Sequence, residues 1–237
     1  TALKNDPTPA TATSLGNGYL QDCSSITEVT IPAGVPGTFT AQNLAGMTSL
    51  KKITFADSET PFKMSVLAFV QNLGEGVKSP IEEIYFGRNL DEGSGSNMPF
   101  RGIKTLKKVT FVGTFTTVDA EMFMGCTGLT EVVYAPGVNV ASLGAGAFAS
   151  CTSLASLQIP AAITAIPERL CSGDAALTSI TMGDAVTSIG ATAFYKTGLK
   201  NLSIPASVQT IYSNAFQGSA LVGEIALPAA LTSVGSQ

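Results

Sequence analysis

The stretch CTSLASLQIP, residues 151–160, holds a clear copy of a pattern that recurs along the chain. In it, Leu157 and Ile159 are separated by one polar residue, and this alternation places both side chains on one face of a short strand. Pro160 follows directly and has no N–H to donate to a neighbouring strand, so it ends the strand. The stretch therefore predicts a short strand with one apolar face, which stops at the proline.

The same pattern, written L-x-x-I-x-I with apolar replacements, occurs nine times. The copies begin at Ile26, Leu50, Ile81, Leu106, Leu129, Leu154, Leu177, Leu199 and Val222. Seven of the eight steps between them span 22–25 residues, and the step from Leu50 to Ile81 spans 31. A period of roughly 20–29 residues is typical of leucine-rich repeats.

A second motif keeps phase with the first: an aliphatic residue, a large apolar residue five positions later, and a small residue three positions after that. Val118, Phe123 and Cys126 are one example. A single coil of this length cannot bury its apolar face, whereas a stack of coils can. We therefore predict a leucine-rich-repeat solenoid of about nine repeats, a right-handed superhelix. It would have one parallel β-sheet, with short turns or helical turns on the opposite side.

The domain organisation follows from the repeat. Residues 5–14 are rich in Pro, Thr and Ala, so we expect a tether or linker over residues 1–13. Residues 14–237 are expected to form a single repeat domain with irregular insertions near 56–80 and 90–100. No apolar run approaches the roughly 20 residues of a membrane-spanning helix. Because the chain opens with Thr1 and not Met, we expect that a leader has been removed.

Composition removes most enzyme classes. The 237 residues include no His, so a Ser-His-Asp triad and a His-based zinc site are excluded. The 13 basic and 17 acidic residues give a net charge of −4, which argues against nucleic-acid binding. The four cysteines lack C-x-x-C spacing, and Cys23, Cys126 and Cys151 share one inward repeat position, so we expect free, packed thiols. We therefore expect no catalytic residues, no cofactor and no metal.

Three segments, TGLTEV at 127–132, CTSLASLQIP at 151–160 and SIGATAF at 188–194, carry a family resemblance. They resemble the BspA-like (Treponema pallidum-type) leucine-rich repeats of bacterial surface proteins, and the likeness runs from Ser14 onward. The resemblance implies a bacterial protein that is extracellular or displayed on the cell surface. It also implies adhesion to host proteins or to other cells.

Charged side chains occupy the outward position before the second apolar residue of each strand. In successive copies this position reads Glu28, Lys52, Glu83, Lys108 and Glu131, so the sign of the charge alternates. Neighbours in a parallel sheet lie about 4.8 Å apart, where opposite charges attract. Two interpretations stay open: a device that sets the register of the stack, or a strip that contacts a ligand. The candidate partner-contact face is Lys52, Thr54, Glu83, Tyr85, Lys108, Thr110 and Glu131.

Two functions from different classes fit this sequence. The first is a non-enzymatic binding or adhesion module. It would recognise a host or bacterial surface protein, or a glycan, through the repeat face or the inserted loops. The alternative is a structural spacer or stalk that presents neighbouring domains. In both cases we expect a monomer that does not bind nucleic acid.

Overall fold

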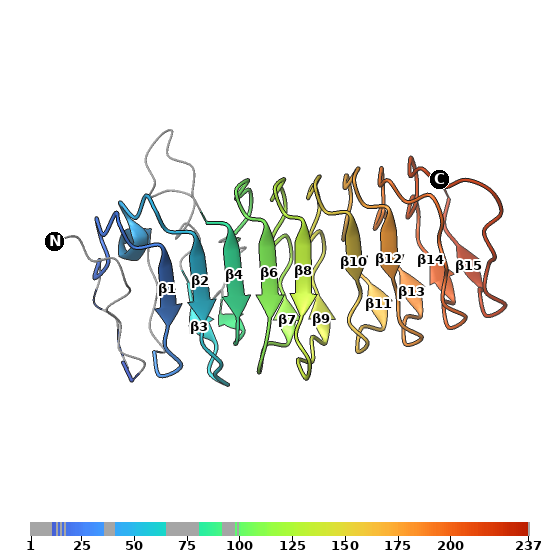
Figure 1. Ribbon diagram of the computed structural model, residues 1–237. Helices are drawn as coiled ribbons and strands as arrows, with labels where there is room; N and C mark the ends of the chain where they lie inside the picture. Colours follow the sequence, from blue (N-terminus) through green and yellow to red (C-terminus); the bar gives the residue numbers. More distant parts are fainter. Residues whose placement is uncertain are drawn as a thin grey trace. The chain divides into compact units, whose positions relative to one another are not determined.

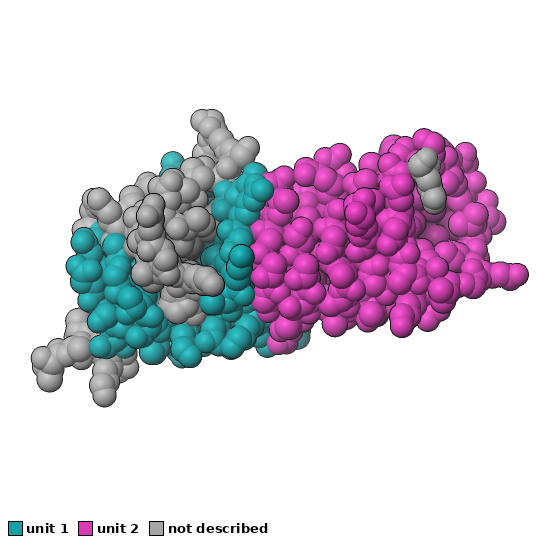
Figure 2. All heavy atoms as spheres, turned by 90° about the horizontal axis from the view of Figure 1, so that it is seen from above, with its two compact units in different colours: residues 1–116, 133–138 teal, residues 117–132, 139–237 magenta. Residues whose placement is uncertain are grey.

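The computed structural model describes residues 11–12, 14, 16, 18–35, 41–64, 81–91, 98 and 100–236. The chain divides into two compact units, shown in Figure 2. Unit 1 contains residues 1–116 and 133–138, and unit 2 contains residues 117–132 and 139–237. Of the tether expected over residues 1–13, only residues 11 and 12 are among those described.

One side of unit 1 is a sheet of short strands whose order follows the sequence (Figure 1). Its strands are β1 (Glu28–Ile31), β2 (Lys52–Phe55), β4 (Glu83–Phe86), β6 (Lys108–Phe111) and β8 (Glu131–Tyr134), of which Val133 and Tyr134 belong to this unit. The first four strands pair in parallel. In β1, Val29 and Ile31 are buried, whereas Glu28 and Thr30 are exposed. The alternation of the motif therefore produces the predicted strands.

Aromatic side chains stack along the end of these strands, in the core of unit 1. The ring of Phe86 lies 5.4 Å from that of Phe55 and 5.5 Å from that of Phe111, and Phe111 lies 5.4 Å from Tyr134, measured between centroids. The planes within each pair differ by 22° or less. Parallel strands in register place the same repeat position of each coil directly over the next, so the rings form a ladder.

Unit 1 has two further strands in segments that the sequence analysis treated as irregular insertions. β3 (Phe62–Lys63) and β5 (Leu90–Asp91) pair in parallel. Phe62 is buried, and its ring packs 5.5 Å from that of Phe55 across the core. Burial of Phe62 and Leu90 explains why these short pieces are ordered. The rest of the two insertions, residues 65–80, 92–97 and 99, lies outside the described residues.

Unit 2 repeats this two-sided arrangement. On one side β10 (Ser156–Gln158) pairs with β12 (Ser179–Thr181). The other side carries two-residue strands: β7 (Thr117–Val118) with β9 (Ser142–Leu143), and then β11 (Ala165–Ile166), β13 (Ser188–Ile189), β14 (Thr210–Ile211) and β15 (Ser233–Val234). All of these pairs are parallel, as a solenoid requires.

The turns that follow the two-residue strands of unit 2 are not helical. The backbone N–H groups of Gly146, Phe148 and Ser150 donate to carbonyl oxygens of the next coil at 2.9–3.0 Å. The alternate donors Ala147 and Ala149 bond within the turn, so only every second N–H does so and no continuous helical hydrogen-bond ladder forms. Within the described residues the one helical turn is the 3-10 turn η1 (Ala41–Leu44) in unit 1. The expectation of short turns is therefore correct, and that of helical turns is wrong except at this position.

Seven of the nine predicted motif copies form strands. The last two, which begin at Leu199 and Val222, form none. The N–H of Val222 donates to the carbonyl of Lys200 at 3.2 Å, but no strand ladder follows. Val222 and Leu227 are 66% and 60% exposed. Val222 and Leu227 thus lie outside the core of unit 2.

Candidate functional site

The charged row predicted on the outer face of unit 1 is confirmed in its register. Glu28 pairs with Lys52, Lys52 with Glu83, and Glu83 with Lys108 across the sheet. The Nζ of Lys52 lies 3.5 Å from a carboxylate oxygen of Glu28. The pair is largely exposed, so its attraction contributes little to stability.

Tyr85 lies beside this row on the same face. The Nζ of Lys52 is 4.9 Å from the centroid of the Tyr85 ring, within the range of a cation–π contact. Thr54 and Thr110 are its neighbours in the adjoining strands. Thr54 and Tyr85 are half-buried and stay available at the surface.

Thr110, which was expected on the contact face, lies in register beside Tyr85 but is almost fully buried. The residue is only 6% exposed, and its hydroxyl is buried with no hydrogen-bond partner among the described residues. Its neighbour in register is Tyr85, whose ring is far larger than the threonine side chain. Thr54 is a register neighbour of Tyr85 as well and stays half-buried, so Thr110 offers a partner less surface than Thr54 does.

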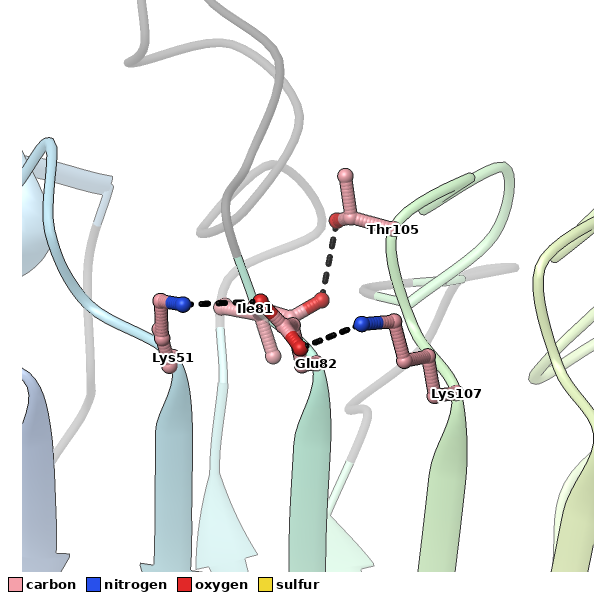
Figure 3. A network of polar contacts seen from close by, with 5 residues as sticks. All are labelled: Lys51, Ile81, Glu82, Thr105 and Lys107. Atoms are coloured by element: carbon pink, nitrogen blue, oxygen red, sulfur yellow. Dashed lines mark hydrogen bonds and ion pairs between the residues drawn. The ribbon is translucent and has the colours of Figure 1, made fainter.

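A second charged row, not predicted from the sequence, consists of Lys51, Glu82 and Lys107 (Figure 3). One carboxylate oxygen of Glu82 lies 3.1 Å from the Nζ of Lys51, and the other lies 2.6 Å from that of Lys107. The hydrogen bond from Lys107, followed by that from Lys51, lowers the pKa of Glu82. These residues come directly before the strands, where the alternation of apolar and polar residues does not predict which way a side chain points. The signal that could have found them is their common repeat position.

The two rows together make bands of charge across unit 1. Lys51 with Lys52 forms a positive band, Glu82 with Glu83 a negative band, and Lys107 with Lys108 a second positive band. Such a surface can select a partner by complementary charge, because a like-charged arrangement is repelled. Glu131, the remaining candidate, is an exposed residue of unit 2.

Arg88 is a basic residue of unit 1 that does not contribute to this surface. It is fully buried, and its guanidinium donates to the backbone carbonyls of Ile31, Pro32, Ala33 and Val35. The guanidinium carbon also lies 5.1 Å from the ring centroid of Phe62. Burial lowers the pKa of Arg88. Its role is to hold the turn after β1 in place.

The cysteines are free thiols. Cys126, Cys151 and Cys171 are buried, as expected for packed side chains, whereas Cys23 is only half-buried. Burial raises the pKa of Cys151 and of Cys171, which makes them poor nucleophiles. Among the described residues no group of three or more Cys, Asp or Glu side chains could hold a metal ion.

Parallel coils with a period near 23 residues, an apolar interior and a polar outer sheet face define a leucine-rich-repeat solenoid. The sequence matches the family described as the BspA type leucine rich repeat region over residues 1–75 and 78–197, in six copies. The chain belongs to this family. No curated protein gives a significant match.

Solved structures of other bacterial repeat proteins are similar to the chain. A leucine-rich repeat protein from Bacteroides ovatus is 20% identical, with a TM-score of 0.47 over 91% of this chain and 71% of that one. A leucine-rich repeat protein from Eubacterium ventriosum is 18% identical, with a TM-score of 0.37 over 90% of this chain and 82% of that one. A leucine rich cell surface protein from Faecalibacterium prausnitzii is 16% identical, with a TM-score of 0.32 over 100% of this chain and 88% of that one. In the described residues no helix is long and apolar enough to cross a membrane.

Proposed function

We propose that the chain is a non-enzymatic binding module that acts outside the bacterial cell and recognises a protein or glycan partner. The observation that carries this proposal is the banded outer face of unit 1, with Tyr85 at its centre. Membership of the BspA-type repeat family supports a role in binding. The surface location is supported by the description of one similar protein as a cell surface protein.

The face favours a partner with charges of its own. Lys52 is engaged by the carboxylate of Glu28 and by the ring of Tyr85, so its ammonium group is held in place. A fixed charge costs less conformational entropy on binding than a mobile one. Because Lys52 lies over the Tyr85 ring, part of that ring is already covered. A charged protein surface or anionic glycan therefore fits better than a neutral sugar stacked on the ring.

Direct binding assays separate this function from that of a spacer. The full chain is tested by surface plasmon resonance against purified extracellular matrix proteins and a glycan array that includes sulfated and sialylated members. A binding module gives saturable binding that weakens at least about tenfold in Tyr85→Ala and in Lys108→Glu. A spacer gives no saturable binding to any of these probes.

Two matched controls sharpen the result. Gln158→Ala removes an exposed outward side chain of β10 in unit 2 and should leave binding unchanged. The quadruple variant Glu28→Lys, Lys52→Glu, Glu83→Lys and Lys108→Glu reverses the polarity of the whole row and keeps unlike charges opposite one another. It should fold normally and lose binding, because the charge pattern and not the pairing itself selects the partner. Binding that survives this reversal would contradict the proposed surface.

A further inference from the structure

Unit 2 contains a buried ionisable position that the proposed binding function does not use. The second motif has three positions, and the residue at its third position points into the stack in successive coils. It is Cys126, Cys151, Asp174 and Thr197, and each is at most 3% exposed. Asp174 is the only one of these four that can carry a charge near neutral pH.

The residues at the equivalent position are hydrogen-bond donors. Thr197 donates its hydroxyl to the carbonyl of Phe194 at 3.0 Å, and the thiol of Cys151 donates to the carbonyl of Phe123 at 3.2 Å. A carboxyl group can act as a donor only when it is protonated. Cys126, Cys151 and Thr197 are neutral at this position, whereas Asp174 is an acid whose Oδ1 accepts the backbone N–H of Cys151.

The contacts of Asp174 leave a negative charge poorly compensated. Its Oδ1 accepts the backbone N–H of Cys151 at 2.8 Å, whereas its buried Oδ2 has no hydrogen-bond partner among the described residues. The titratable groups packed against it are the thiols of Cys151 and Cys171, and Cys126 lies next to Cys151. No cation pairs with Asp174 among the residues that the structure describes.

Burial governs the titration of this group. It raises the pKa of Asp174 to about 8, although hydrogen bonds from the backbone of Cys151 and Ser150 and from the thiol of Cys171 act in the opposite direction. Burial also raises the pKa of both thiols above their ordinary values. Asp174 is thus the first group of the cluster to ionise as the pH rises.

We propose that Asp174 is a proton-controlled latch: when protonated it holds adjacent coils of unit 2 closed, and when ionised it opens them and exposes the thiols of Cys151 and Cys171. Ionisation releases one proton to solvent and leaves a carboxylate with an unpartnered oxygen in an apolar interior. Such a charge is far more stable in water. Local opening of the coil hydrates the carboxylate, and the same opening uncovers the neighbouring thiols.

Alkylation of the buried thiols tests the latch in the full chain. The protein is treated with iodoacetamide from about pH 6 to about pH 9.5, and each cysteine is quantified by peptide mass spectrometry. Each rate is divided by the rate of the same cysteine in the urea-unfolded chain, which removes the intrinsic pH dependence of the thiolate. Protection of Cys151 and Cys171 should fall by up to about tenfold per pH unit as the pH rises to about 8, and it should level off above that pH. Protection that stays constant across the range would overturn the proposal.

Variants separate the latch from general alkaline loosening. Asp174→Asn keeps an acceptor for the N–H of Cys151 but cannot ionise, so its protection should not change with pH. If it fails to fold, Asp174→Thr serves instead, since Thr197 occupies the same position one coil later. Asp184→Asn, an exposed carboxyl of unit 2, should behave as the wild type. A folded Asp174 variant that keeps the wild-type pH dependence would refute the latch.

Discussion

The ammonium of Lys52 lies over the ring of Tyr85, 4.9 Å from its centroid, one strand across and two residues along the outer face of unit 1. We expect ring-current shifts of the Lys52 Hε protons that disappear in Tyr85→Ala and persist in Tyr85→Phe, because the phenylalanine ring keeps the same face. NMR of the wild type and both variants measures this. The contact should contribute about 0.5–1 kcal/mol in a double-mutant cycle. Identical shifts in all three proteins would show that the contact does not form in solution.

Glu82 should titrate below an ordinary glutamate. Its pKa is lowered by Lys107 and then by Lys51, so its ion pairs stabilise the fold above the pKa of the unfolded chain. That stability is lost as the pH falls through the lower pKa of the folded state. A carbon-detected NMR titration should show the Glu82 midpoint rising in Lys107→Ala, and rising less in Lys51→Ala. Lys200→Ala, a variant in unit 2, is expected to leave it unchanged.

Phe86 is the central rung of the aromatic ladder in unit 1. It is fully buried and stacks on Phe55 and Phe111, so Phe86→Ala should destabilise the fold by about 3–5 kcal/mol through the cavity it leaves. Phe86→Leu should cost less, since it restores most of the lost volume. Urea unfolding followed by circular dichroism measures both. Tyr212→Ala, at a side chain that is 52% exposed, is the control and should have a small effect.

Gly190 lies where the backbone of the preceding coil leaves no room for a side chain. A Cβ at this position would lie 2.6 Å from the backbone nitrogen of Glu168, which is backbone and cannot move aside cheaply. Gly190→Ala should therefore destabilise unit 2 by about 1–3 kcal/mol. Gly183→Ala is the matched control, because its nearest neighbour would be at 3.8 Å. Equal thermal stability of the two variants would contradict this close packing.

Asp174 predicts an unusual dependence of stability on pH. Its pKa is raised on folding from 3.8 to about 8, so the folded chain binds more protons than the unfolded chain between these values. This contribution is complete below about pH 4 and is lost as the pH rises to about 8, a change on the order of 5 kcal/mol. The free energy of unfolding from urea melts at several pH values should show the fall. In Asp174→Asn the free energy of unfolding should not show this fall between low pH and about pH 8.

The repeat made most of the fold accessible from the sequence. Alternating apolar residues and a fixed period are local properties, and they were sufficient to place β2 and β4 in register despite the 31-residue step between their motifs. The charged row of Lys52 and Glu83 followed from the same period. The charge pattern of the exposed face was thus predictable, although the burial of Thr110 was not, because burial depends on everything that the folded chain places around a residue.

Other features depend on contacts that no local pattern contains. The strands at Phe62 and Leu90 are only two residues long, and they are ordered by packing against the core and not by periodicity. Asp174 looks like a polar turn residue in the sequence, and only the stacked coils bury it. The sequence alone determined that the chain forms parallel coils and which residues face inward, since side-chain direction in a strand alternates by necessity. Only the tertiary structure decided which polar groups meet, because burial and hydrogen bonding between coils depend on what the stack places beside each residue.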